Sequence, residues 1–376
     1  MNTLSNKATS TLTVHAPGRI NLIGEHTDYN DGYVLPAAID KYLTVKLKAN
    51  DTDAKVKLTA TDLDESFDFD LQDFSPAASG WPNYVMGVVH ELQKKGAQIK
   101  GFDASFNSQV PIGSGMSSSA ALECGFAVAL NELFRLGFDH WALIKAAQMA
   151  EHNFVGIRCG IMDQFASMLG QKGRVMLLDC RSLNFEYFPL ELERYELLLL
   201  NTNVSHNLAT SAYNTRRAAC EEGAATLNQL YGNIQNLRDV SMEQLRAAKA
   251  KLSPTVFKRC HHVVAENQRV LQATQALTDS NHRLLGQLMY QSHTSLAQDF
   301  EVSCPELDFL VQQTLDMDFV LGSRMMGGGF GGCTINIIER QRAEAFVDTV
   351  SKRYKNQFGL ELTPITVATG NGAQAF

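Results

Sequence analysis

The stretch Pro111-Ile-Gly-Ser-Gly-Met-Ser-Ser-Ser-Ala-Ala-Leu122 joins the end of an expected strand to a strongly helical run. Val110 is the last apolar residue of that strand, and glycines at positions 113 and 115 leave the backbone free to turn. The helix that follows, through Leu133, is apolar on nearly every side, so we expect it to be buried. The stretch therefore places serine hydroxyls and backbone N–H groups at the amino end of a core helix.

This loop has the features of an anion-binding site. At a helix N-terminus, N–H donors that lack helical partners and the helix dipole both favour negative charge. The loop is not a Walker A loop, because no Gly-Lys-Ser/Thr follows the glycines. An ordinary serine cap after a glycine turn is the alternative. We therefore expect residues 113–119 either to bind phosphate or to cap the helix.

A second polar cluster lies upstream, in the run Ala16-Pro-Gly-Arg-Ile-Asn-Leu-Ile-Gly-Glu-His-Thr-Asp-Tyr-Asn-Asp-Gly32. Apolar stretches at residues 11–14 and 33–39 flank the run, and its glycines permit turns, so we expect a loop between two strands. Carboxylates accept hydrogen bonds from sugar hydroxyls, and an imidazole donates or accepts them. The cluster therefore suits a polyhydroxy ligand, with a solvated turn as the alternative. Its charged and titratable members of interest are Arg19, Glu25, His26 and Asp28.

Two further carboxylates lie at helix ends. Asp163 falls in the first turn of a helix expected over residues 161–169, whose apolar residues recur at helical spacing. The helix dipole favours negative charge there, so Asp163 is a candidate general base. Glu151 ends an alanine-rich helix and is a candidate metal ligand. The alternatives are an ordinary first-turn aspartate and a solvated helix end.

A glycine-rich stretch, Gly327-Gly-Gly-Phe-Gly-Gly332, contains the spacing GxGxxG. A dinucleotide-binding turn would need a strand before it and a helix after it. Here an expected strand at residues 334–338 follows instead, which excludes that interpretation. We favour a functional loop over a flexible linker, because the stretch leads directly into an apolar strand.

The remaining pattern indicates an α+β protein of two domains rather than the regular alternation of a doubly wound sheet. From residue 211 to about 318 the chain is expected to be mostly helical. We assign residues 1–200 to the first domain and 201–376 to the second, and leave open whether the last strand returns to the first domain. Strands are expected at 43–48, 67–71, 102–110, 175–178, 197–201, 334–338 and 363–368, and helices at 81–95, 117–136, 141–155, 161–169 and 341–356.

Composition narrows the class of protein. The chain has 376 residues, of which 45% are hydrophobic and 19% charged, as in ordinary globular proteins. A net charge of −7 argues against nucleic-acid binding. Seven cysteines without a CxxC pair indicate reduced thiols, and the chain shows neither a signal peptide nor an apolar run near the ~20 residues that cross a bilayer. We therefore expect a cytoplasmic protein without nucleic-acid or membrane partners and, lacking heptads, a monomer.

With these segments in order, the chain resembles the GHMP small-molecule kinases, and within them the galactokinases, over nearly its whole length. The GHMP loop Pro-x-x-x-Gly-x-Ser-Ser-Ser-Ala is matched from Pro111 to Ala120, and the late glycine-rich loop by residues 327–332. Residues 18–28 and the segment Cys159-Gly-Ile-Met-Asp-Gln164 resemble galactokinases in particular. Met116 and Ala121 replace the usual Leu and Ser without changing an assigned hydroxyl or charge. The resemblance implies a two-domain GHMP-kinase-like fold with the active site in the cleft between the domains.

The resemblance also implies a role for each polar segment. Asp163 would take the proton from the C1 hydroxyl of galactose, and Arg19 beside it would stabilise charge during transfer. Ser119 and Glu151 would hold Mg²⁺ as the cofactor. The residues that would bind galactose are Glu25, His26, Thr27, Asp28, Gly160 and Tyr213, the last within Ser-Ala-Tyr-Asn-Thr-Arg-Arg. Those that would bind ATP are Gly113, Ser114, Gly115, Met116, Ser117, Ser118 and Ser119.

The activity implied is that of an ATP-dependent sugar 1-kinase, which transfers the γ-phosphate of ATP to α-D-galactose and yields α-D-galactose 1-phosphate and ADP. This is the first step of galactose use by the Leloir pathway. Two alternatives share these motifs: an N-acetylgalactosamine kinase, which would differ in the room around C2 of the sugar, and a non-catalytic galactose sensor on the same fold. The presence of Arg19, Ser119, Glu151 and Asp163 argues against the sensor.

Overall fold

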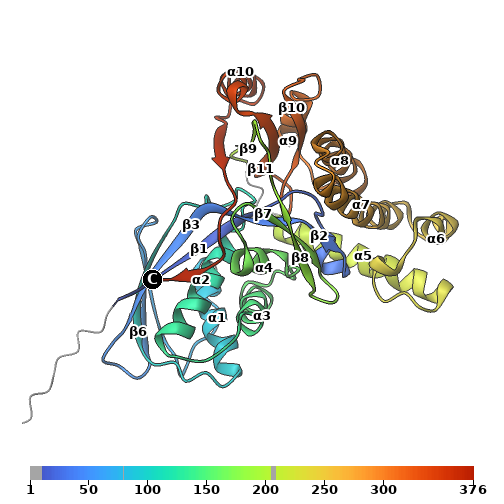
Figure 1. Cartoon of the computed structure of the whole chain (residues 1–376). Coiled ribbons are helices and arrows are strands. Elements are labelled where there is room, and N and C mark those ends of the chain that lie inside the picture. Colours follow the sequence, from blue (N-terminus) through green and yellow to red (C-terminus); the bar gives the residue numbers. More distant parts are fainter. Residues whose placement is uncertain (1–10, 79, 205–208) are drawn as a thin grey trace, which may run out of the picture.

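A six-stranded sheet organises the first part of the molecule. The computed structural model describes residues 11–78, 80–204 and 209–376. The strand order is β13-β1-β3-β6-β4-β5, and every neighbouring pair is antiparallel except β4 with β6 (Figure 1). The strands are β1 (Leu12–Asn21), β3 (Pro36–Ala49), β4 (Lys55–Ala60), β5 (Glu65–Asp70), β6 (Phe102–Ser108) and β13 (Gln374–Ala375).

Four helices cover one face of this sheet (Figure 1). They are α1 (Pro82–Lys94), α2 (Ser118–Leu133), α3 (His140–Ala150) and α4 (Met162–Leu169). Helix α2 lies at the centre and contacts β1 and β3, and every residue from Ala120 to Leu130 is buried. Gly125 permits this approach, because a Cβ there would lie 3.1 Å from Cγ2 of Val45. The expected burial of this helix is confirmed.

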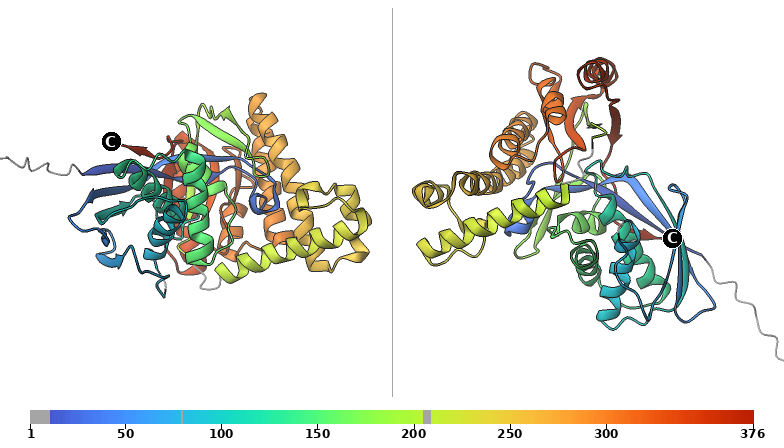
Figure 2. Two further views of the ribbon diagram at one scale, coloured as in Figure 1. Left: turned by 90° about the horizontal axis from the view of Figure 1, so that it is seen from below. Right: turned by 180° about the vertical axis from the view of Figure 1, so that it is seen from behind.

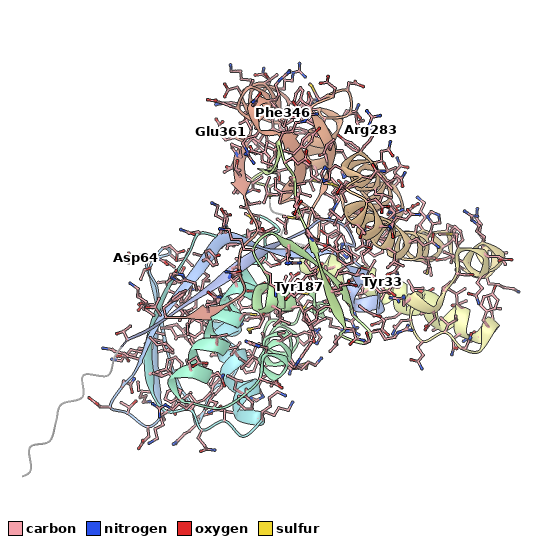
Figure 3. All side chains as sticks on the ribbon, in the orientation of Figure 1. Tyr33, Asp64, Tyr187, Arg283, Phe346 and Glu361 are labelled. Atoms are coloured by element: carbon pink, nitrogen blue, oxygen red, sulfur yellow. The ribbon has the colours of Figure 1, made fainter. Side chains whose placement is uncertain are left out.

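A small three-stranded sheet lies between the two halves of the molecule. It has the order β2-β7-β8, with β2 (Tyr33–Val34), β7 (Arg174–Asp179) and β8 (Phe185–Pro189). Figure 3 labels Tyr187 near the centre of the molecule and Tyr33 to its right, with Phe346 of the second domain above them and Asp64 of the β4–β5 turn far to the left. The small sheet therefore lies between the six-stranded sheet of the first domain and the second domain.

The second part of the chain is built on a four-stranded antiparallel sheet of order β10-β11-β9-β12. Its strands are β9 (Tyr195–Asn201), β10 (Val320–Met325), β11 (Cys333–Glu339) and β12 (Thr363–Val367). Helices α9 (Pro305–Gln312) and α10 (Arg340–Phe358) pack on it through an apolar cluster that includes Leu198, Leu310 and Tyr354.

A group of helices extends from this sheet. They are α5 (Ala209–Tyr231), α6 (Met242–Ala247), α7 (Pro254–Thr278) and α8 (His282–Ser295). Helix α7 begins where local chemistry requires it, because the Ser253 hydroxyl accepts the Val256 N–H at 3.2 Å and Pro254 occupies the first helical position. Both views in Figure 2 show α5 starting beside the first domain and running out toward α6.

Short helical turns complete the described chain. Two are π-helical turns, at Glu151–Val155 directly after α3 and at Leu296–Phe300 directly after α8. Three are single 3₁₀ turns, at Asp28–Asn30, Leu237–Asp239 and Lys249–Lys251. The first turn of each kind carries residues of the expected site, Asp28 and Glu151, so the irregular backbone coincides with the functional segments.

The α+β class is confirmed, and the strands β4, β8, β10 and β13 were not predicted. One placement is wrong. Arg19 was expected on a loop, but it lies on β1, which continues to Asn21. The expected last strand, β12, pairs with β9, whereas β13 beyond it pairs with β1. The boundary at residue 200 stays a prediction, and β9 just before it is hydrogen-bonded within the second sheet.

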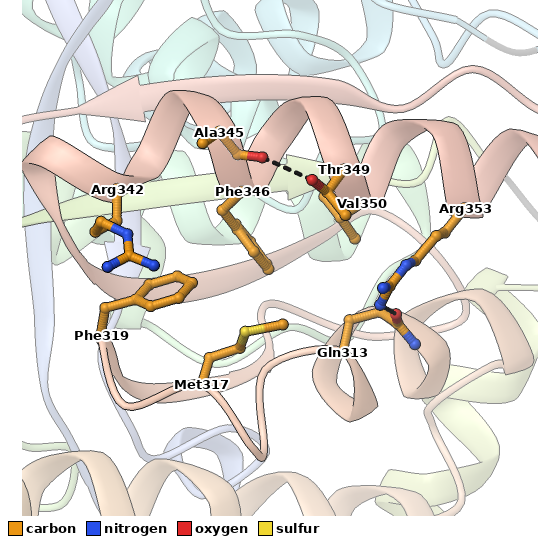
Figure 4. A pocket seen from close by; sticks show the side chains of 9 residues that line it. All are labelled: Gln313, Met317, Phe319, Arg342, Ala345, Phe346, Thr349, Val350 and Arg353. Carbon is orange, nitrogen blue, oxygen red and sulfur yellow. Dashed lines mark hydrogen bonds between the residues drawn. The ribbon is translucent and has the colours of Figure 1, made fainter.

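A surface groove of about 230 Å³ lies between α10 and the segment that joins α9 to β10 (Figure 4). Phe346 and Met317 form its floor, and Arg342 and Arg353 stand at its two ends. The guanidinium carbon of Arg342 lies 4.5 Å from the centre of the Phe319 ring. These elements contribute none of the residues expected in the site. Within the described parts of the chain, every helix is too short or too polar to cross a membrane.

Candidate active site

The strongest polar contact at the expected site joins β1 to α4. Arg19 donates from Nε to Oδ1 of Asp163 at 2.7 Å and from Nη2 to Oδ2 at 2.8 Å. The Ser117 hydroxyl donates to the same Oδ2, and Nη1 of Arg19 donates to the Gly115 carbonyl. Arg19 is 4% exposed, whereas the Asp163 side chain keeps 31% of its surface exposed. A charge-assisted bidentate pair is directional, so the carboxylate is oriented while one side stays accessible.

The phosphate-loop candidate is attached directly to β1. The Arg19 N–H donates to the Met116 carbonyl at 3.0 Å. Gly18 allows this contact, because a Cβ there would lie 2.8 Å from the Met116 oxygen. Ser117 precedes α2 in a left-handed conformation with φ of 56°. Its side chain does not cap the helix, because its hydroxyl donates a hydrogen bond to Asp163 instead. The simple serine cap is therefore wrong for Ser117.

The glycine-rich loop connects β10 to β11 and lies against the phosphate loop. A Cβ on Gly115 would lie 2.8 Å from the Met326 carbonyl, and one on Gly332 would lie 3.1 Å from the carbonyl carbon of Ser114. The Gly327 N–H donates to Oε1 of Glu25 at 2.7 Å. Residues 327–332 thus join the phosphate loop to the 22–32 loop, an arrangement that favours the functional loop over the linker.

Glu25 is buried, and both of its carboxylate oxygens are engaged by protein donors. Oε2 accepts from Asn21 at 2.7 Å, and Oε1 accepts from Arg324 at 2.9 Å as well as from Gly327. The Thr27 hydroxyl has one proton to donate and lies within hydrogen-bond distance of two carbonyls, those of Gly24 at 2.8 Å and of Tyr33 on β2 at 2.6 Å. Both residues therefore stabilise the loop itself in this structure, and their direct contact with a sugar stays a prediction.

His26 lies in an aromatic pocket. Its Nδ1 shares a hydrogen bond with the Tyr29 hydroxyl at 2.8 Å, and its ring centre lies 5.4 Å from that of Tyr213 and 4.7 Å from that of Phe300. Burial lowers the pKa of His26 to about 3, so the ring is neutral near pH 7. Nε2 makes no hydrogen bond of good geometry with the described residues, although the main chain of Gly328 lies near the ring. A ligand hydroxyl would supply the missing partner.

Asp28 and Gly160 lie against each other. A Cβ on Gly160 would overlap the Asp28 carboxylate, so only glycine fits there. Burial, with Asp163 as the next cause, raises the pKa of Asp28 to about 7. Since Asp28 and Asp163 repel each other, the site collects negative charge that a ligand rich in hydroxyl donors would offset.

The candidate metal ligands also come together. Ser119 lies in the first turn of α2, and Glu151 begins the π-helical turn after α3. Burial raises the pKa of Glu151, and hydrogen bonds from Cys159 and Ser119 oppose that rise. A buried carboxylate beside a hydroxyl oxygen is the kind of donor set that Mg²⁺ accepts, with phosphates and waters completing its shell.

A cavity of about 600 Å³ opens beside Ser118 and Ser119. Its walls include the aromatic rings of Trp81, Tyr84 and Phe106. Sequence reasoning missed this cavity. One signal was present: Ile112 directly precedes the phosphate loop, and it is 73% exposed at the cavity. A large exposed apolar residue next to a phosphate site is typical of a surface that an organic ring covers.

Sequence reasoning also missed the supports of the 22–32 loop. Arg324 of β10 is completely buried and donates to the Leu22 carbonyl at 2.8 Å as well as to Glu25. From α7, Glu266 accepts the Gly24 N–H at 2.9 Å, and His262 donates to the Glu25 carbonyl at 3.1 Å. Burial would raise the pKa of Glu266, but Arg269 beside it lowers the value to about 2. No local sequence motif marks these residues, because their partners are remote in the chain.

Comparisons with known proteins agree with this geometry. Residues 4–48 match the galactokinase galactose-binding signature, residues 83–171 the N-terminal domain of GHMP kinases and residues 273–356 their C-terminal domain. The chain is 40% identical to a galactokinase of Thermotoga petrophila over 96% of its own length and 99% of that protein. It is 43% identical to a galactokinase of Homo sapiens, over 91% and 88% of the two chains.

A solved structure is also closely similar. The galactokinase of Lactococcus lactis, in complex with galactose, superposes with a TM-score of 0.92 at 36% identity, over 97% of this chain and 95% of that one. Both its fold and its sequence therefore extend over nearly the whole of the present chain. This chain belongs to the galactokinases, within the GHMP kinase family.

Proposed function

We propose that this chain transfers the γ-phosphate of ATP to the C1 hydroxyl of α-D-galactose, giving α-D-galactose 1-phosphate and ADP. The observation that carries this function is the cluster of Arg19, Asp163 and Ser117. It places an accessible carboxylate between the phosphate loop and the 22–32 loop. Phosphoryl transfer needs positioning and charge stabilisation more than covalent chemistry, and this cluster supplies both.

The sugar is bound by the polar groups around this carboxylate. Asp28 accepts hydrogen bonds from hydroxyls, and Nε2 of His26 donates or accepts one. Gly160 and Tyr213 form the adjoining walls. Glu25 and Thr27 line the same loop and keep it in shape through their own hydrogen bonds. The site thus offers acceptors to a ligand that is rich in hydroxyl donors.

In the proposed reaction, the C1 hydroxyl gives its proton to Asp163 as its oxygen attacks the γ-phosphorus. The bond from that phosphorus to the bridging oxygen breaks, and ADP leaves. Oδ2 already accepts from Arg19 and Ser117, so Oδ1 is the oxygen better placed to take the proton. Arg19 remains beside the transferring group and stabilises the negative charge there.

The cavity and the phosphate loop together form the proposed binding site for ATP. Residues 113–119 would surround the phosphates at the start of α2, where N–H groups and the helix dipole favour anions. Ser119 and Glu151 would hold Mg²⁺, which neutralises phosphate charge when it is bound. The cavity beside Ser118 would take the base and ribose of ATP, with Trp81 and Ile112 against the base.

A coupled assay of ADP release with Mg·ATP tests this function. Galactose, glucose, N-acetylgalactosamine, homoserine and mevalonate are each supplied as acceptor, with a reaction that lacks acceptor as the control. Rapid release with galactose alone supports the proposal. Equal release of ADP with N-acetylgalactosamine would indicate a 1-kinase that accepts both sugars. Absence of turnover together with thermal stabilisation by galactose would indicate a sensor and contradict the proposal.

A further inference from the structure

Helix α5 of the second domain holds the 156–160 segment of the first domain. Nη1 of Arg217 donates to the Arg158 carbonyl at 2.7 Å. Asn214, almost one helical turn earlier, accepts the Arg158 N–H and donates to the Gly156 carbonyl, each at 3.4 Å. All three contacts reach main-chain groups of the segment. They therefore hold its backbone, and the Arg158 side chain adds a further contact with α5, donating to Oε1 of Glu221 at 2.7 Å.

Arg217 is itself held in one orientation. Its Nε donates to Oε1 of Glu221 at 3.0 Å, one turn further along α5. Its guanidinium carbon lies 5.6 Å from the centre of the Tyr29 ring, and the side chain is 19% exposed. The planar guanidinium is thus supported by a carboxylate and an aromatic ring. That support directs the remaining N–H groups toward the 156–160 segment.

The segment that Arg217 holds ends at the sugar site. Gly160 lies on the Asp28 carboxylate with no room for a Cβ. Tyr213, four residues before Arg217 and on the same face of α5, lies beside His26. A shift of the segment away from α5 would separate Gly160 from Asp28. The contacts of Arg217 therefore bear directly on the shape of the sugar pocket.

We propose that Arg217 is a positioning residue for galactose, which fastens the 156–160 segment to α5 and keeps Gly160 against Asp28. This inference rests on the proposed function, because it assumes that Asp28 and Gly160 contact the sugar. Arg217 also contributes positive charge near Asp28, and that charge opposes the rise of the Asp28 pKa. The other titratable groups that interact with Asp28 are Glu25, Asp163, Arg19, Tyr29, Tyr213 and Cys180.

The test compares Arg217→Met with the matched control Arg283→Met, at an exposed position of α8. Methionine keeps the unbranched stem of arginine and loses the donors and the charge, and the control makes the same change far from the 156–160 segment. We expect Arg217→Met to raise KM for galactose about tenfold, as the loss of one charge-assisted hydrogen bond would. KM for ATP should stay within about twofold of wild type, and Arg283→Met should stay near wild type for both substrates.

Two readouts separate positioning from a general loss of structure. Hydrogen exchange in the substrate-free protein should be faster for the amides of residues 156–160 in Arg217→Met and unchanged in Arg283→Met. The acid limb of kcat/KM for galactose should move to higher pH in Arg217→Met, because Asp28 loses a neighbouring positive charge. Arg217→Lys keeps that charge, so its acid limb should stay in place while KM rises less.

A wild-type KM for galactose and wild-type exchange in Arg217→Met would overturn the inference. If Arg217→Met does not fold, the same two measurements on Arg217→Lys decide it, since lysine replaces the fork of donors by a single ammonium. If the wild-type protein releases no ADP with galactose, the proposed function fails. The exchange measurement then still decides whether Arg217 holds the segment.

Discussion

Arg324 on β10 and Glu25 after β1 form an ion pair with 2.9 Å between Nη2 and Oε1, and neither side chain is more than 2% exposed. The pair joins the second sheet to the loop that carries His26 and Asp28. Asn21 and the Gly327 N–H complete the hydrogen bonds of the carboxylate. Buried charges are retained only where their hydrogen bonds are satisfied, and here they are shared between two domains.

Removing one charge of this pair should destabilise the whole molecule. In Glu25→Gln, Arg324 would stay buried without its counter-ion, and we expect the free energy of unfolding to fall by about 3 kcal/mol. Urea unfolding measures this. Glu221→Gln is the control, because the Glu221 carboxylate is 45% exposed and loss of its pairs with Arg158 and Arg217 should change stability by less than about 1 kcal/mol. Equal losses in both variants would refute the prediction.

Asp163→Asn should abolish turnover and leave galactose binding largely intact. The amide cannot take the C1 proton, so kcat should fall by a factor on the order of 10²–10⁴, while the neighbouring binding groups remain. Steady-state kinetics and calorimetric titration with galactose measure the two effects separately. Asp348→Asn, on the exposed surface of α10, should leave both unchanged. Lost binding in a folded Asp163→Asn protein would make this residue chiefly a sugar contact.

The activity should depend on pH through Asp28. Its folded-state pKa is about 7, so its carboxylate fraction, and with it kcat/KM for galactose, should rise with pH up to about that value. A pH series of initial rates at low galactose concentration measures this rise of kcat/KM. Asp28→Asn should lower kcat/KM and remove its rise with pH. A flat profile between pH 5.5 and about 8 in the wild-type protein would count against an ionised Asp28 in the complex.

The same residue should make stability depend on pH in the opposite sense. The folded protein keeps a proton on Asp28 that the unfolded chain releases above the ordinary aspartate pKa of 3.8. Unfolding therefore becomes easier as pH rises from about 4 to about 7, by up to about 1.4 kcal/mol per pH unit for this group. Urea unfolding of wild type and Asp28→Asn at several pH values gives the difference between their free energies of unfolding. If that difference does not vary with pH, the prediction is wrong.

Trp81→Ala should weaken ATP binding and spare galactose binding. Trp81 stands in the wall of the cavity beside Ser118, edge-on to Phe106 at 5.0 Å, and its Nε1 donates to Glu65 at 2.6 Å. Loss of this aromatic surface should raise KM for ATP about tenfold and leave KM for galactose within about twofold. Trp141, the other tryptophan, lies outside the cavity, and Trp141→Ala is the control. An unchanged KM for ATP would place the base elsewhere.

The parts of the fold that could be predicted are those with local signals. Helices α1, α2 and α4 follow apolar residues at helical spacing, and β11 and β12 follow short β-branched runs. Strand β10 was not predicted, because Gly322, Ser323 and Arg324 interrupt its apolar pattern. Those residues are buried, but their burial depends on partners from β1 and α8 that no local window contains.

The candidate site shows the same limit. Residues of the Arg19–Asp163–Ser117 cluster could be nominated because each lies in a motif, whereas their mutual contact spans 144 residues and is visible only in the fold. His262, Glu266 and Arg324 lie in no motif, since they act through buried contacts with the loop. The placement of Arg19 on β1 rather than a loop follows from its pairing with Ala38 on β3.

The pairing of β13 with β1 has a consequence for how the protein is made. His15 and Val14 of β1 pair with Gln374 and Ala375, and the Phe376 N–H donates to the Thr13 carbonyl at 2.8 Å. During translation, β1 and β3 leave the ribosome early, but β13 emerges only after the entire second domain. Until then the outer edge of β1 is an unpaired strand edge, open to other nascent chains. Completion of the first sheet is thereby delayed until the second domain has been synthesised.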